Sequence, residues 1–245
     1  MAEFYEVYVR AACLLLVVLA VGIGWAGARR ARLSPLGSGL FLTTAVLFFG
    51  AWYATAIPLA QAGRFNVPTT PSDPPIVLMF LFGGAFLLFG LAWWTPLGRR
   101  LTEATPLAAI AAFQIPRFVG GVFLVGWVAG DIPALFAIPA GLGDILAGMA
   151  GWQASRALVK NRPEARRLLM RATWIGMADF AVAVVLGIVT STGFAHLFAR
   201  EAPNIINEYP LAMFPAYIVP IFLGFHLIAI ARIRQEHTRR MTAVI

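Results

Sequence analysis

The chain has 245 residues, of which 60% are hydrophobic and 12% are charged, and its mean hydropathy is +0.80. A soluble domain carries about 25% charged residues, so this composition excludes an ordinary soluble fold and indicates an integral membrane protein. The net charge of +8 lies in short basic clusters between apolar segments, which is typical of membrane topology and argues against a surface that binds nucleic acid.

Hydropathy along the chain predicts seven membrane spans. A hydrocarbon core of about 30 Å needs about 20 apolar residues per helix, and the apolar runs here are of that length. A membrane β-barrel would show alternating segments of about 10 residues instead, so the runs predict helices. We therefore expect an all-α, polytopic membrane protein in which residues 1–245 form a single seven-helix transmembrane bundle. The predicted spans are 8–28, 40–60, 76–95, 106–128, 132–154, 172–194 and 211–231.

The basic residues predict the orientation of the bundle. Lys and Arg gather in the loops of one side and are scarce on the other, in strict alternation along the chain. Cytoplasmic loops carry an excess of basic residues, so we expect an outside N-terminus and a cytoplasmic C-terminus in a multi-pass protein of the cell membrane. The basic side would then face anionic lipid, and nucleic acid is not an expected partner. The residues on the predicted cytoplasmic side are Arg29, Arg30, Arg32, Arg99, Arg100, Arg156, Lys160, Arg162, Arg166, Arg167, Arg171, Arg232, Arg234, Arg239 and Arg240, against Arg10, Arg64 and Arg200 opposite.

Two charged residues lie at bilayer depth in the fourth and fifth spans. Such groups cost about 2.5–3.5 kcal/mol each on insertion scales, so they call for an explanation. Arg117 precedes the turn at residues 130–131, and Asp144 follows that turn by a similar number of residues, so both lie about 20 Å from it. Sequence-adjacent antiparallel helices place those levels side by side. We therefore predict an Arg117–Asp144 pair, which would act either as a structural link or as part of a substrate or ion site.

The neighbours of Arg117 supply further polar groups. Gln114 lies three residues before Arg117 and shares its helical face. Pro116 has no amide hydrogen, so the carbonyl of Ala112 loses its usual helical partner. We expect that carbonyl to be a second acceptor within reach of Arg117.

A second polar pair is predicted nearer the cytoplasmic side. Asp179 lies in the first third of the sixth span, counted from that side, and His226 enters the seventh span from the same side. We expect the two to meet in the inner third of the bundle, where a carboxylate and an imidazole can form a proton relay. A histidine bonded to a backbone carbonyl is the alternative.

Glycines on the same spans predict close helix packing. Gly141, Gly148 and Gly151 share a face of the fifth span with Asp144, while Gly121 lies on the face of Arg117 and Gly187 on that of Asp179. Small residues let neighbouring helices approach closely, either within one chain or between copies.

No motif assigns an enzymatic reaction. The sequence contains no phosphate-binding loop, no GxSxG and no HExxH, so we assign no catalytic residues. His196, His226 and His237 are too dispersed to share a metal, so no metal ligands are expected, and the sequence indicates no particular cofactor.

Three functions are open on these grounds. The first is a proton-linked transporter or channel for a small molecule or ion, with Arg117, Asp144 and Gln114 at the central site and Asp179 and His226 on a cytoplasmic proton path. The second is an accessory or sensory subunit of a homo-oligomer or larger membrane complex, with a structural Arg117–Asp144 pair. The third is a membrane enzyme acting on a lipid or quinone. The depth of the polar residues favours the first.

Overall fold

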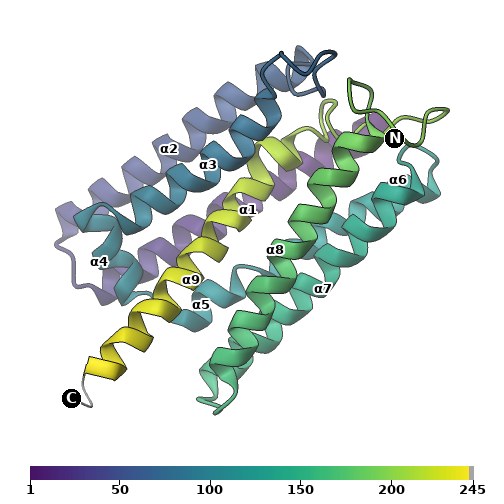
Figure 1. Cartoon of the computed structure of the whole chain (residues 1–245). Helices are drawn as coiled ribbons and strands as arrows, with labels where there is room; N and C mark the ends of the chain where they lie inside the picture. The colour runs from purple at the N-terminus through teal and green to yellow at the C-terminus, as the bar shows by residue number, and fades with distance from the viewer. Residues whose placement is uncertain (243–245) are drawn as a thin grey trace.

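The computed structural model describes residues 1–242, which form helices joined by short loops (Figure 1). The long helices are α1 (Ala2–Arg30), α2 (Pro35–Gln61), α3 (Ile76–Trp93), α7 (Ala134–Val159), α8 (Ala165–Thr190) and α9 (Val219–Thr242). The short ones are α4 (Pro96–Ala104), α5 (Leu107–Ala112), the 3-10 helix η1 (Ile115–Gly121), α6 (Val122–Val128) and the π-helical turn η2 (Phe214–Ile218). Within the described residues, seven segments are long and apolar enough to cross a membrane, and no strand is present. The all-helical, seven-span prediction is confirmed at this level.

The helix ends differ from the predicted spans where helices extend beyond their apolar part. The first helix begins at Ala2 rather than residue 8, and the fifth continues to Val159. Hydropathy locates only the apolar stretch, whereas the helical hydrogen bonds continue into polar sequence. The sixth helix ends earlier than predicted, at Thr190, because Ser191 adopts an extended conformation and its hydroxyl donates to the carbonyl of Asn204 at 3.1 Å.

The short helix α4 is an element that hydropathy did not predict. Its N-cap, Thr95, accepts a hydrogen bond from the amide of Gly98 at 3.0 Å, and Pro96 occupies the first turn, where its missing amide is tolerated. Leu101 is buried, while Arg99 and Arg100 on the other side are exposed. This amphipathic helix lies across the end of the bundle between α3 and α5 (Figure 1).

The last transmembrane segment occupies the centre of the bundle. In the most apolar stretch of this segment 72% of the residues are buried, whereas in that of α2 only 11% are. The segment η2–α9 packs against α3 on one side and α8 on the other, while α7 and α8 pack together along their length. Helix α2 is the outermost helix and contacts α1 and η2 (Figure 1). The core of the protein therefore forms around the segment that begins at Phe214.

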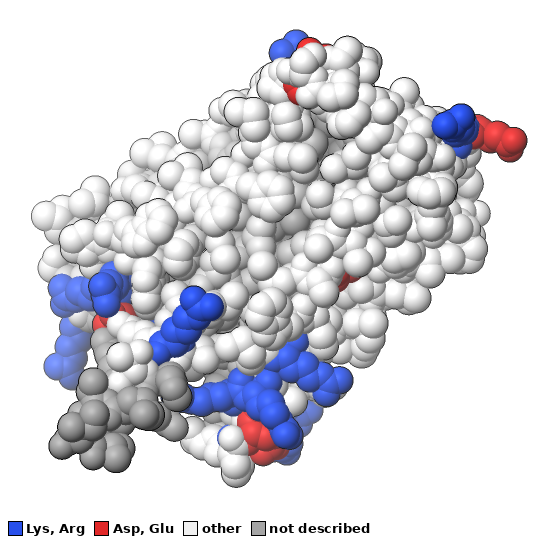
Figure 2. Space-filling view, viewed as in Figure 1, with Lys and Arg blue, Asp and Glu red and all other residues white. Residues whose placement is uncertain are grey.

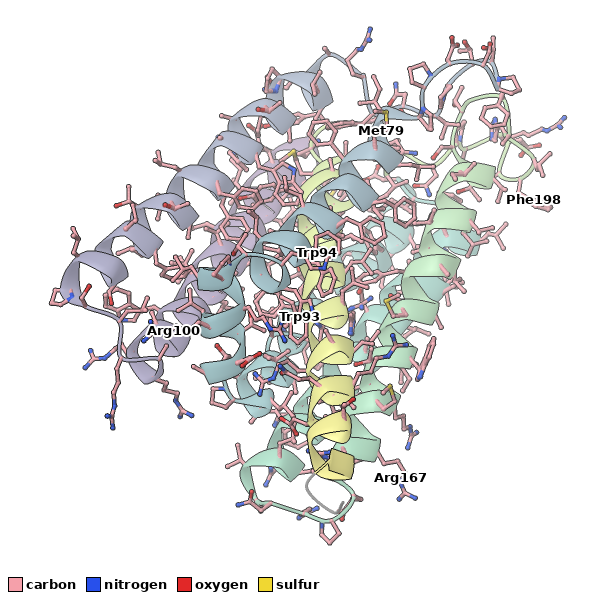
Figure 3. All side chains as sticks on the ribbon, turned by 60° about the vertical axis from the view of Figure 1, so that its left-hand side comes forward. Met79, Trp93, Trp94, Arg100, Arg167 and Phe198 are labelled. Atoms are coloured by element: carbon pink, nitrogen blue, oxygen red, sulfur yellow. The ribbon has the colours of Figure 1, made fainter. Side chains whose placement is uncertain are left out.

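Charged residues gather at the two ends of the bundle and leave a wide uncharged belt between them (Figure 2). One end, which we call the basic end, holds α4, the α7–α8 turn and the end of α9, with most of the Lys and Arg residues. Arg239 and Arg240 belong to α9, but their side chains lie outside the described residues. The opposite end, which we call the loop end, holds the loops 62–75 and 191–213. Figure 3 shows Met79 and Phe198 toward the loop end, and Arg100 and Arg167 toward the basic end.

The glycines of α7 face the broken fourth segment. A β-carbon on Gly151 would lie 2.7 Å from the β-carbon of Gln114, and one on Gly148 would lie 3.1 Å from the carbonyl oxygen of Ile115. A β-carbon on Gly141 would lie 2.7 Å from the side chain of Leu124. The absence of side chains at these three positions lets α7 approach α5, η1 and α6 closely.

Two other glycines do not serve close packing in this way. A β-carbon on Gly121 would meet no atom within 4 Å, because the 3-10 geometry turns this residue away from α7. The prediction for Gly121 is therefore wrong, and its neighbour Gly120 makes the close approach instead. A β-carbon on Gly187 would meet Phe136 at 3.6 Å, an ordinary contact distance that does not require glycine.

These contacts predict opposite outcomes for two glycine substitutions. Gly151→Ala forces a β-carbon against the backbone of α5 and should destabilise the protein by about 1–3 kcal/mol. Gly121→Ala, the control, should leave stability unchanged or slightly raised, because alanine favours the helix and meets open space. Unfolding by SDS in mixed micelles measures both free energies, and an equal loss in the two variants would contradict the packing described here.

Candidate functional site

Arg117 is positioned by a break in the fourth transmembrane segment. Helix α5 ends at Ala112, and the chain continues through the 3-10 helix η1, which contains Pro116 in its first turn. Proline cannot donate the hydrogen bond that a regular α-helix requires, so the chain tightens here, and the amide of Arg117 donates to the carbonyl of Gln114 at 3.2 Å. The Arg117 side chain is directed into the bundle and is 0% exposed.

The guanidinium group of Arg117 binds both intramembrane aspartates. Its Nε donates to Oδ1 of Asp144 at 2.8 Å, and one terminal nitrogen lies 2.7 Å from the same oxygen. That terminal nitrogen also pairs with Oδ2 of Asp179. The other terminal nitrogen donates to the carbonyl of Gly176 at 3.3 Å. The guanidinium carbon lies 3.7 Å from the centre of the Phe180 ring, so an aromatic face covers the charge as well.

The predicted Arg117–Asp144 pair is confirmed, but it is part of a larger cluster. Nε2 of His226 lies 3.5 Å from the guanidinium group, and Asp179 is paired with the same group. The sequence placed Asp179 and His226 in a separate pair. In the described residues each contacts Arg117, and no hydrogen bond joins the two directly. We call Arg117, Asp144, Asp179 and His226 the charge cluster.

Asp144 and Asp179 lie at similar depths below the loop end, and this match is the signal that could have assigned Asp179 to the cluster. Asp144 lies ten residues after Ala134, where α7 begins, and Asp179 lies eleven residues before Thr190, where α8 ends. Both carboxylates are therefore about 15–17 Å from the loop end, near the middle of the bundle. Counting from the basic end hid this match, because α8 begins seven residues before the predicted span. The carbonyl acceptor of Arg117 also differs from the expected Ala112 and is Gly176 on α8.

Three glycines make room for the charged groups. A β-carbon on Gly120 would overlap the carboxyl group of Asp144, and one on Gly143 would overlap that of Asp179. A β-carbon on Gly176 would overlap the His226 ring and approach a terminal nitrogen of Arg117 at 2.9 Å. The side chains of the cluster therefore occupy the space that a larger residue at these three positions would fill.

Gln114 lies beside the cluster toward the basic end. Its amide nitrogen donates to the carbonyl of Phe222 at 3.4 Å, and its side-chain oxygen is buried without a hydrogen-bond partner in the described part of the chain. The structure thus places the side chain of Gln114 against α9, and the described residues show no hydrogen bond between it and the side chain of Arg117.

A cavity of about 70 Å³ lies between the cluster and the loop end. Ile206 and Asn207 line it at that end, and Asp144 and Asp179 line it at the other. The walls between them are mostly apolar and include aromatic residues of α6, α7, α8 and η2. The side chain of Asp144 keeps 15% of its surface exposed, whereas that of Arg117 has none. Figure 2 shows a small acidic patch within the otherwise uncharged belt.

Aromatic and polar contacts fill the bundle between the cluster and the basic end. Phe113 and Phe225 stack with ring centres 3.7 Å apart. Further along, Arg232 donates to the carbonyl of Thr105 at 2.9 Å, and Glu236 pairs with Arg166 of α8. These contacts tie α9 to the α4–α5 connection and to α8.

The donor set of the cluster does not form a metal site. No group of three or more His, Cys, Asp or Glu residues suited to a metal occurs in the part of the chain that the structure describes, from which the side chain of His237 is excluded. Arg117 itself fills the space between the two carboxylates. Arg117 therefore supplies one positive charge at the position between the two carboxylates.

The protein is all-helical in its described residues, has seven segments long and apolar enough to span a membrane, and contains a buried ionic cluster, which together are typical of multi-pass membrane proteins. Residues 74–234 match the family of a domain of unknown function, DUF8737, and the chain belongs to this family. The matched region runs from the start of α3 into α9 and contains the whole charge cluster. No curated protein and no solved structure significantly matches the chain.

The charge balance of the cluster predicts an order of stabilities. Arg117→Ala leaves two buried carboxylates without a cation and should lower the free energy of unfolding by about 3–5 kcal/mol. Asp144→Asn keeps the pair of Arg117 with Asp179 and retains an acceptor oxygen, so it should cost only about 0.5–1.5 kcal/mol. Thermal or SDS unfolding of the purified variants measures the difference. An Arg117→Ala protein as stable as Asp144→Asn would contradict the pairing.

Proposed function

We propose that the protein is a proton-linked transporter or channel for a small molecule or ion, with the charge cluster as its central site. The observation that supports this most directly is the cavity between the loop end and the cluster, which Asp144 and Asp179 line. Intramembrane charges that border a cavity mark substrate or ion pathways in other membrane proteins.

The charges of the cluster favour a cation as the transported species. One arginine faces two aspartates, so two ionised carboxylates would leave one negative charge uncompensated in a low-dielectric interior. An isolated buried charge is costly, and such a site lowers its energy by taking up a proton or another cation. Both carboxylates border the cavity, so either can receive it from that side.

Two irregular helices border the same site, as expected for a transporter. The 3-10 helix η1 carries Arg117, and the π-helical turn η2 contributes Phe214 and Pro215 to the cavity wall. Transporters use interrupted helices at their binding sites, where the chain can bend. These breaks supply hinges next to the cluster, and opening of the Phe113–Phe225 layer and the Arg166–Glu236 pair would connect it to the basic end.

The alternatives receive less support from the site. An enzyme using Asp179 and His226 as acid and base needs both groups available to a substrate, but Arg117 engages each of them. In an accessory subunit the Arg117–Asp144 pair would be purely structural, and that role does not explain why a cavity borders the two carboxylates.

A flux measurement in proteoliposomes tests the proposal. With a pH indicator inside and an imposed membrane potential, the wild-type protein should move protons alone or with one of a panel of small cations. Asp144→Asn and Asp179→Asn should each lower the flux by about tenfold or more, because an amide neither takes up a proton nor pairs with a cation, and a loss of about 1.4 kcal/mol in cation binding is already tenfold.

Asp73→Asn is the matched control for this measurement. It removes the same charge from an exposed loop residue, whose partner is the Thr70 hydroxyl at 2.9 Å, and should leave the flux unchanged. Undiminished flux in both cluster variants would remove the aspartates from the mechanism. Absence of flux in the wild type, together with a copurifying partner, would favour the accessory-subunit alternative.

The proposed orientation places the basic end in the cytoplasm and the loop end outside the cell membrane. Two exposed positions, Ser72 at the loop end and Lys160 at the basic end, report on it when each is replaced by cysteine in a Cys13→Ala background. A membrane-impermeant maleimide should label Ser72→Cys in intact cells and Lys160→Cys only after lysis. The reverse pattern would overturn the orientation.

A further inference from the structure

A second cavity, of about 340 Å³, lies in the half of the bundle nearest the basic end. Helices α1, α2 and α3 form its walls, and α4 covers it with Leu97 and Leu101. It is separate from the charge cluster, and none of the four cluster residues lines it.

The wall of this cavity suits an apolar occupant. Its lining is almost entirely aliphatic and aromatic, and three of the four threonine hydroxyls in it already have backbone partners; the fourth threonine, Thr44, lies at the exposed rim. Thr95 donates to the carbonyl of Leu91 at 2.7 Å, Thr102 to that of Ala92 at 3.0 Å, and Thr105 to that of Leu101 at 2.9 Å. These hydroxyl protons are therefore not available to a polar ligand.

The length and opening of the cavity fit a lipid chain. On α2 it extends from Leu40 to Phe49, a rise of about 14 Å, which is close to the depth of about 15 Å that one leaflet contributes to the hydrocarbon core. Helix α2 packs on α1 and η2 but makes few contacts with α3, and Leu40 and Thr44 at the rim are exposed. A chain can therefore enter between α2 and α3 from the bilayer.

Basic residues surround the end of the cavity where a lipid headgroup would lie. Arg99 and Arg100 of α4 are exposed next to the leucines that cover the cavity. Arg100 donates to the carbonyl of Ala31 at 2.8 Å, which brings it to the α1–α2 turn that also carries Arg29, Arg30 and Arg32.

Tryptophans mark the interface at the same end. Trp94 is 73% exposed, and Arg99 lies 5.5 Å from the ring centre of Trp93. Figure 3 shows both tryptophans at the end of α3 with Arg100 on the same side of the bundle. Interfacial tryptophans occupy the level of lipid headgroups, so the arginines lie at phosphate height.

We infer that this cavity is a binding site for an anionic phospholipid of the leaflet at the basic end. One acyl chain occupies the space between α2 and α3, and the phosphate binds the arginines of α4 and the α1–α2 turn. The inference does not depend on transport by the charge cluster.

Native mass spectrometry of the detergent-solubilised full chain tests the site. Phosphatidylglycerol and phosphatidylcholine with identical acyl chains are added in equal amounts, and the wild type should retain phosphatidylglycerol preferentially. Ala45→Trp fills the cavity and should weaken retention by about tenfold or more, because excluding two buried methylenes has an effect of that size. Arg99→Gln combined with Arg100→Gln should weaken it by roughly 30-fold, since each arginine contributes about fivefold.

A control pair at the same end removes the same charge away from the cavity. Arg167→Gln combined with Arg171→Gln, on exposed positions of α8, should retain phosphatidylglycerol as the wild type does. Thr44→Trp at the exposed rim replaces Ala45→Trp if the latter fails to elute as a folded protein. Equal retention of the two lipids, undiminished retention in the tryptophan variant, or an equal loss in the α8 control would each overturn the inference.

Discussion

The burial of one arginine between two aspartates is the constraint on which the centre of this bundle depends. A guanidinium group without surface exposure must be neutralised and hydrogen-bonded, and its donors reach carboxylates on α7 and α8 and a carbonyl on α8. The helices must come close enough for one side chain to span them, which requires glycine at positions 120, 143 and 176. The break in the fourth segment follows from the same need, because η1 places the arginine at the level of both acids.

The second effect of this arrangement is electrostatic. A buried pair with matched charges has no net charge, whereas here two acids surround one base, an arrangement on which the proposed uptake of a proton or cation rests. The apolar walls strengthen the effect, because the cavity beside the acids contributes few competing polar groups. The buried ring of His226 lies against the guanidinium group on the side of Arg117 that faces α9. The geometry combines closely packed helices with one more acid than base at their centre.

Much of this architecture could be predicted from local sequence, and the remainder depended on which helices are neighbours. Apolar runs located the seven spans, and equal depth on consecutive helices located the Arg117–Asp144 pair. Asp179 was assigned to the wrong partner because α8 extends past its apolar part, which displaced the reference point for its depth. Helix α4 was missed because nine amphipathic residues resemble a polar loop in a hydropathy profile. Gly120 and Gly143 could not be recognised, since the groups that they accommodate come from other helices.

The family match begins at residue 74, just before α3, and the two cavities differ in how much of their lining lies within the matched segment. The segment 74–234 holds every residue of the charge cluster and of the cavity beside it. The larger cavity takes two of its walls from α1 and α2, which lie before that segment. A relative that shares only the matched segment would thus keep the ionic centre intact and lose the enclosure next to the basic end. The ionic centre and the larger cavity therefore depend on different, partly overlapping stretches of the chain.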